Sequence, residues 1–115
     1  MSREGRILID GRWRGTRAST PVVNPWNGEA VGSMALAEGH EVVAAIDSAV
    51  AAQPALSSLP AYRRAEILRR VSQSIAARAH DLASTLALET AKPIRDARAE
   101  VARAATTFAL AADEA

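Results

Sequence analysis

The sequence predicts an α+β segment, in which N-terminal β-hairpins over residues 1–36 are followed by a helical layer over residues 38–115. Two observations support this class. Apolar residues recur at about every second position in the first stretch and follow the 3.6-residue period of a helix in the second. The turn-forming pairs Asp10-Gly11 and Asn27-Gly28 interrupt the first stretch, whereas widely spaced prolines punctuate the second.

The first hairpin is predicted from residues 6–9 and 12–14. Asp10-Gly11 joins these two runs and suits a type I′ turn, because aspartate and glycine tolerate the positive φ angles that both central positions require. Residues 15–19 have a turn-like composition.

A second strand pair is predicted over residues 20–24 and 29–36. Pro25 suits the second position of the turn between them, and Asn27-Gly28 tolerates a left-handed conformation. We therefore expect all strands to lie within the first 36 residues.

The first helix is expected from about residue 38 to Pro54, which should end it because proline lacks the amide N–H of a helix interior. One face of this helix is apolar and the opposite face carries Glu41, Asp47 and Ser48. The apolar stripe consists of Val42, Ala45, Ile46, Ala49 and Val50.

A second helix is predicted from Pro60, because proline suits the first turn of a helix. Glu66 precedes Arg69 and Arg70 by three and four residues, a spacing that favours ion pairs on one helix face. The pattern breaks or bends around residues 78–81. The apolar face before and after this break consists of Ile67, Leu68, Val71, Ile75 and Leu82.

Two further helices complete the predicted layer. A short one is expected from about Asp81 to Thr90, and Pro93 should open the last. The predicted inner face of the last helix consists of Ala97, Val101, Ala104, Ala105 and Phe108.

The composition narrows the classes of function. A chain of 115 residues forms one domain at most, and a net charge of +1 disfavours binding to a polyanion. The absence of cysteine excludes disulfides, thiolate metal sites and thiol catalysis by this chain. The sequence has neither the apolar core of a signal peptide nor an apolar run of membrane-spanning length, so we expect a cytoplasmic protein without a membrane partner.

No catalytic, cofactor-binding or metal-binding residue is predicted from the residues themselves. His40 and His80 have no acidic or thiol partner at metal-ligand spacing, and Gly28 and Gly32 form no phosphate-binding loop. A basic helix could indicate nucleic-acid binding, but no aromatic residue interleaves its arginines, and a solvated, salt-bridged face is the better interpretation. These arginines are Arg63, Arg64, Arg69, Arg70 and Arg78.

Five stretches in a fixed order carry a recognisable pattern. They are Ile9-Asp10-Gly11-Arg12-Trp13; Val23-Asn24-Pro25 with Gly28-Glu29; Val42 to Ile46; Leu59 to Arg69; and Glu89-Thr90-Ala91-Lys92-Pro93 followed by Ala99-Glu100-Val101. Together they resemble the N-terminal segment of the NAD(P)-dependent aldehyde dehydrogenase family. The residues from Leu59 to Tyr62 and from Asp96 to Val101 are most similar to those of the branch acting on lactaldehyde, phosphonoacetaldehyde and glyceraldehyde 3-phosphate.

The chain departs from the family pattern at two positions. Ala91 stands where glycine is usual, and Leu56 stands where tryptophan is common. Leu56 is compatible with packing. Ala91 is harder to accommodate if the glycine it replaces has a positive φ angle.

The resemblance implies a role for the segment. It would form the N-terminal part of a cofactor-binding domain within an α/β aldehyde dehydrogenase-like fold, with the catalytic domain absent from residues 1–115. In the family, the glutamate base, the cysteine nucleophile and the βαβ core that binds NAD or NADP all lie beyond this segment. The expected function is therefore that of a scaffold for the oxidation of an aldehyde to an acid, without catalysis by this chain alone.

Two further features of the family are not carried over to this chain. Pro25-Trp26-Asn27 looks like the family motif whose asparagine stabilises the oxyanion, but Gly28-Glu29 follows it, so Asn27 is interpreted as a turn residue. Some members bind a structural cation near the equivalents of Val23 and Glu100. Only these two positions match, so no metal ligand is assigned.

Two partners are compatible with such a segment: the remainder of the enzyme, or another copy of the chain. The alternative function is a truncated, non-enzymatic protein that oligomerises or docks on a full-length homologue through exposed apolar helix faces. The two hypotheses differ on whether the reading frame after codon 115 continues into a cysteine-containing domain.

Overall fold

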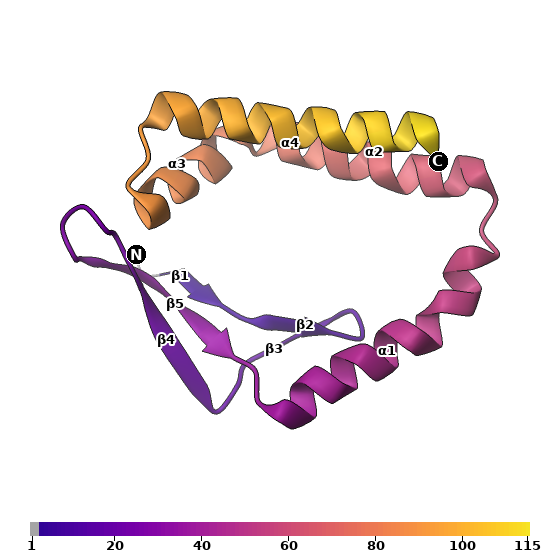
Figure 1. Ribbon diagram of the computed structural model, residues 1–115, viewed down its shortest axis with the longest axis horizontal. Helices are drawn as coiled ribbons and strands as arrows, with labels where there is room; N and C mark the ends of the chain where they lie inside the picture. Colours follow the sequence, from indigo (N-terminus) through magenta and orange to yellow (C-terminus); the bar gives the residue numbers. More distant parts are fainter. Residues whose placement is uncertain (1–2) are drawn as a thin grey trace. The chain divides into compact units, whose positions relative to one another are not determined.

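The computed structural model describes residues 3–115, so the first two residues of the predicted 1–36 ribbon lie outside the described part. The chain divides into two compact units on either side of the Ser58–Leu59 bond. The first holds the strands and one helix, and the second holds three helices (Figure 1). Strands end at Leu36 and helices begin at Gly39, which confirms the predicted switch of secondary structure.

The first unit contains two small sheets. Strands β2 (Ile7–Ile9) and β3 (Arg12–Arg14) form an antiparallel hairpin, as predicted. Asp10 and Gly11 have φ angles of 52° and 68°, which confirms a turn with two left-handed residues. The other sheet has the order β1-β5-β4, with β4 (Ala18–Val23) antiparallel to β5 (Ala30–Leu36).

Strand β1 (Arg3–Gly5), which pairs in parallel with residues 32–34 of β5, was not predicted from the sequence. Three residues are too few to show an alternating pattern, so the strand depends on its distant partner. A Cβ at Gly5 would overlap the sulfur of Met34, so the flexible Met34 side chain would have to move to accept a larger residue there. The prediction that residues 15–19 form a turn is wrong at its end, because Ala18 and Ser19 already pair with β5.

Helix α1 (Gly39–Ser57) begins with a capping box. Glu41 accepts a hydrogen bond from the Glu38 backbone N–H at 2.8 Å, and Glu38 caps the helix in return. The predicted end at Pro54 is wrong, because the helix continues through it. Proline removes only its own donor, and the Ser58 N–H still bonds the Pro54 carbonyl at 3.2 Å.

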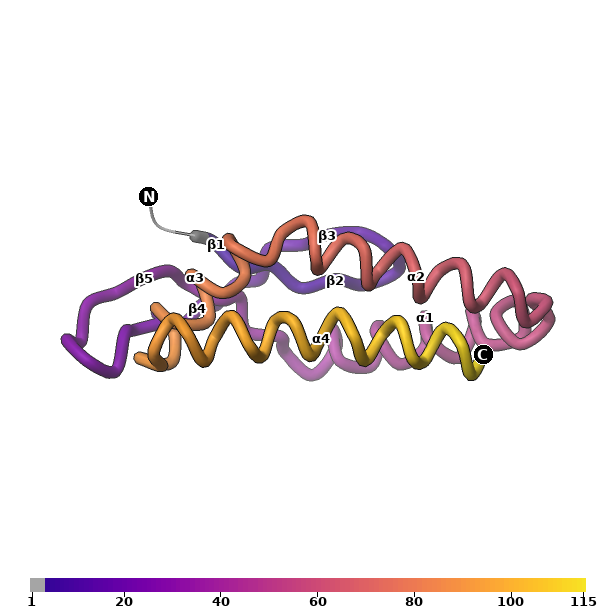
Figure 2. The backbone as a smooth tube through the Cα atoms, turned by 90° about the horizontal axis from the view of Figure 1, so that it is seen from above, coloured from indigo at the N-terminus to yellow at the C-terminus, as the bar shows by residue number. Residues whose placement is uncertain are grey.

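The second unit contains α2 (Ala61–Ala77), α3 (Ala79–Thr90) and α4 (Ile94–Glu114). Pro60 and Pro93 directly precede α2 and α4, as predicted. The predicted break lies at Arg78, whose φ and ψ of −104° and 15° separate α2 from α3, so α3 starts two residues earlier than expected. Helices α2 and α4 lie side by side (Figure 2).

Alanine dominates the core of this second unit. Ala83 and Ala97 are fully buried, and Val101 is nearly so, with Ile75, Leu82 and Leu86 packed against them. The predicted inner face of α4 is confirmed for Ala97 and Val101, whereas its other members are half-buried. Ala112, 2 % exposed, was missed because a methyl group carries little apolar signal. Small side chains let the helices approach closely but bury little area each.

Candidate functional site

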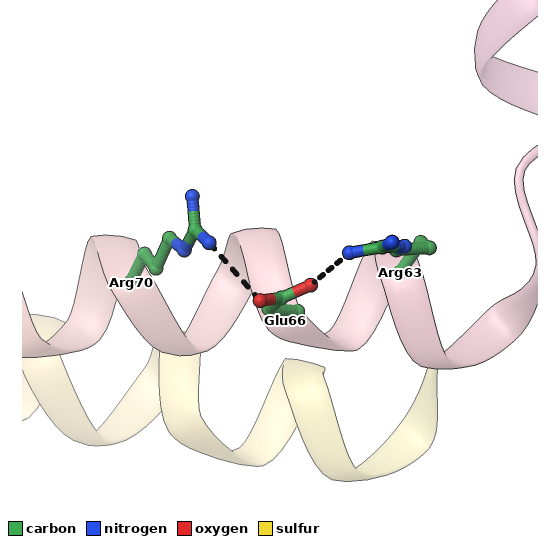
Figure 3. A network of polar contacts seen from close by, with 3 residues as sticks. All are labelled: Arg63, Glu66 and Arg70. Atoms are coloured by element: carbon green, nitrogen blue, oxygen red, sulfur yellow. Dashed lines mark hydrogen bonds and ion pairs between the residues drawn. The ribbon is translucent and has the colours of Figure 1, made fainter.

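Glu66 lies between two arginines on the exposed face of α2 (Figure 3). Its carboxylate accepts hydrogen bonds from Arg63 Nη1 and Arg70 Nη2, both at 3.0 Å. The hydrogen bond from Arg63 and then the charge of Arg70 hold the pKa of Glu66 below its ordinary value. All three side chains are well exposed, so this is a solvated ion-pair cluster rather than a reactive carboxylate.

The predicted pair between Glu66 and Arg69 is wrong. Arg69 Nη2 instead contacts Asp113 Oδ1 at 3.1 Å, because its position on α2 directs it toward α4. The remaining arginines of the basic helix also have local partners. Arg64 donates to the Leu59 and Ala115 carbonyls at 2.6 and 3.0 Å, and Arg78 pairs with Asp81 at 3.2 Å. The interpretation of this face as salt-bridged is therefore confirmed for Arg63, Arg69, Arg70 and Arg78, whereas Arg64 binds backbone oxygens.

A second charged cluster connects the start of α4 to the segment before it. Lys92 Nζ contacts Glu100 Oε1 at 2.5 Å, and Arg103 Nη2 lies 3.8 Å from the same oxygen. The hydrogen bond from Lys92 is the main cause of a lowered pKa at Glu100. Sequence reasoning missed this pair, because the two residues are eight positions apart with Pro93 between them and lack the i,i+4 spacing of a helix pair.

The two histidines considered as metal ligands belong to different units. His40 Nδ1 lies 3.7 Å from Glu38 at the start of α1, and His80 lies exposed in the other unit. From residue 3 onward, no group of three or more histidine, cysteine, aspartate or glutamate side chains could hold a metal ion. Val23 and Glu100 belong to different units, and Glu100 is engaged by cationic side chains of its own helix region.

Asn27 is a turn residue in the structure, as interpreted from the sequence. Its side chain accepts a hydrogen bond from the Glu29 N–H at 3.1 Å and donates one to the Glu29 carboxylate at 2.9 Å. Asn24 accepts from the Trp26 N–H at 2.9 Å, and Gly28 has a φ of 73°. Both the oxygen and the nitrogen of the Asn27 side-chain amide thus stabilise the β4–β5 turn. Gly32 pairs within β5, away from any strand-to-helix turn.

Ala91, which stands where the family has glycine, adopts a left-handed conformation. It directly follows α3 with φ and ψ of 55° and 23°. Glycine takes this conformation freely, whereas an alanine Cβ meets the neighbouring carbonyl oxygen at a cost of about 1–2 kcal/mol. The departure at this position is therefore a local strain at the α3–α4 connection.

Each unit also carries an open apolar groove. In the first unit, a groove of about 360 Å³ lies between β2 and α1, with Leu8, Val42 and Ile46 among its lining residues. In the second, the α2 groove of about 450 Å³ runs over Ile67, Val71, Ile75 and Leu82, with Arg70, Ser74 and Arg78 completing it. Neither groove brings together an acid, a base and a nucleophile, so both are suited to packing rather than to chemistry.

None of the helices described from residue 39 to residue 114 has both the length and the apolar character required to cross a membrane.

A protein-family model described as the aldehyde dehydrogenase family matches residues 13–115. The chain is 35% identical over 106 residues to a lactaldehyde dehydrogenase of Methanocaldococcus jannaschii, covering 92% of this chain and 23% of the relative. It is 37% identical over 111 residues to the NADP(+) succinate-semialdehyde dehydrogenase of Escherichia coli, covering 95% of this chain and 23% of the relative.

A solved structure shows the same arrangement of elements. Aldehyde dehydrogenase 21 of Physcomitrella patens, in complex with the reaction product succinate, superposes with a TM-score of 0.94 at 34% identity. The match covers 99% of this chain and 24% of the solved one. The chain thus spans about a quarter of the length of the proteins it matches.

Proposed function

The chain belongs to the aldehyde dehydrogenase family, and from this premise we propose that it acts as the N-terminal scaffold segment of an NAD(P)-dependent aldehyde dehydrogenase. The parent reaction would oxidise an aldehyde to an acid with hydride transfer to the cofactor. Enzymes of the family use NAD or NADP. The segment would contribute packing surface and hold no reacting group, which agrees with a sequence that lacks cysteine.

The observation that carries this proposal is the small core. Among the described residues only six apolar side chains are buried, four of them alanines, and the largest are Ile9 and Val101. Sixteen large apolar or aromatic side chains are at least 40% exposed. Burial stabilises by about 25 cal/mol per Å², so a core built on methyl groups leaves a small margin. If further protein covered the exposed side chains, their burial would add the stabilisation that the small core does not provide.

Helix α1 shows this need most clearly. It holds no buried residue along its described length, and Val43, Ile46 and Val50 are 56%, 56% and 68% exposed. Val42 and Ile46 line the groove beside β2, whereas Val43 and Val50 do not, so part of the apolar face of α1 lies outside this groove. An exposed apolar helix face of this kind is normally buried against another element of the protein.

In the second unit, the α2 groove is the apolar surface that corresponds to the exposed face of α1. In its apolar floor Ile67 is exposed and Val71, Ile75 and Leu82 are half-buried. Helix α2 already packs against α4, where the Ser72 hydroxyl donates to the Ala105 carbonyl at 2.8 Å. Because α2 uses one face for α4, this second apolar face remains for another element. We propose that the remaining part of the enzyme covers it, in a cytoplasmic protein.

The experiment that tests this proposal is a chimera. The stretch of the E. coli relative that matches this chain is replaced by residues 1–115, and NADPH formation with succinate semialdehyde is measured. We expect a folded and active enzyme. In that chimera Val71→Asp should lower the melting temperature and the activity, because it places a charge in the α2 groove. The matched control Gln73→Asp lies on the exposed part of the same helix and should leave both nearly unchanged.

The contrary result is equally specific. An inactive or insoluble chimera, together with an isolated chain that melts cooperatively as a monomer, contradicts the scaffold proposal. It would favour the alternative of a non-enzymatic module that oligomerises or docks on a full-length homologue. In that case Val71→Asp should abolish self-association or docking instead.

A further inference from the structure

We draw no further inference here: the strongest candidate, the α2 groove between Arg70 and Arg78, belongs to the docking surface already proposed, and nothing in the structure shows what else would cover it.

Discussion

Lys92 and Glu100 form an ion pair across Pro93, with Lys92 Nζ 2.5 Å from Glu100 Oε1. The pair ties the connection after α3 to the second turn of α4, and Arg103 adds a more distant positive charge at 3.8 Å. Both partners are only partly exposed, so the contact is better shielded from solvent than the cluster around Glu66. The contact also allows a prediction for the acid titration of the Glu100 carboxylate.

The pKa of Glu100 should lie below its ordinary value of 4.5, mainly because Lys92 donates a hydrogen bond to the carboxylate. A lowered pKa in the folded chain means that the stabilisation is present above the unfolded-state pKa and is lost as the pH falls through the folded one. We expect Lys92→Met to raise the Glu100 pKa by more than Arg103→Met does. Carboxyl chemical shifts followed through an acid titration measure this order, and equal shifts in the two variants would contradict it.

Ala91→Gly should stabilise the second unit. The left-handed backbone costs alanine about 1–2 kcal/mol, and part of this gain is offset by the greater freedom of glycine in the unfolded chain, which leaves about 0.5–1 kcal/mol. Urea unfolding followed by circular dichroism measures the change. Ala102→Gly, in the exposed interior of α4, is the matched control and should destabilise by about 1 kcal/mol. A destabilisation by Ala91→Gly of the same size as in the control would show that Ala91 is not strained.

The isolated chain of 115 residues should show no aldehyde dehydrogenase activity. It has no cysteine to form a thiohemiacetal with the aldehyde. The measurement is NADH or NADPH formation with several aldehydes, using protein purified away from host enzymes. Aldehyde-dependent turnover that follows the chain through every purification step would overturn this expectation.

The isolated chain should self-associate or bind hydrophobic dyes, because its apolar helix faces lack a partner. Val50, 68% exposed on α1, is the most sensitive place to test this. Val50→Lys should lower both dye fluorescence and the apparent mass in sedimentation, whereas Gln53→Lys on the same helix should change neither. A wild-type chain that sediments as a monomer, melts sharply and binds no dye would show a self-sufficient domain.

The local signals in the sequence predicted most of the fold. Asp10-Gly11 and Asn27-Gly28 set the hairpins, and Pro60 and Pro93 set two helix starts, because these residues restrict their own backbone. The features that were missed depend on distant partners. Strand β1 exists through its pairing with β5, and Arg69 finds Asp113 on α4 rather than its neighbour Glu66. Pro54 was given too much weight, because a single missing donor does not stop a helix.

In the candidate site, too, the features set by neighbouring residues were predicted and those that depend on distant residues were not. Asn27 was correctly interpreted as a turn residue, since its signal lies in the adjacent Gly28-Glu29. The contact of Lys92 with Glu100 was not predictable from spacing, because Pro93 redirects the chain between them. The grooves were not predictable either, since they depend on how α1 lies beside β2 and α3 beside α2.

Because the core consists mostly of alanine, the positions that tolerate substitution least are small residues rather than large ones. Ala83 and Ala97 are fully buried where α3 meets α4, so even one added methylene has no room there. The large side chains, such as Trp26 at 86% exposure, have space around them. In a saturation library of the segment, the strictest positions would therefore be among its smallest residues, and the bulky ones would vary freely until further protein covers them.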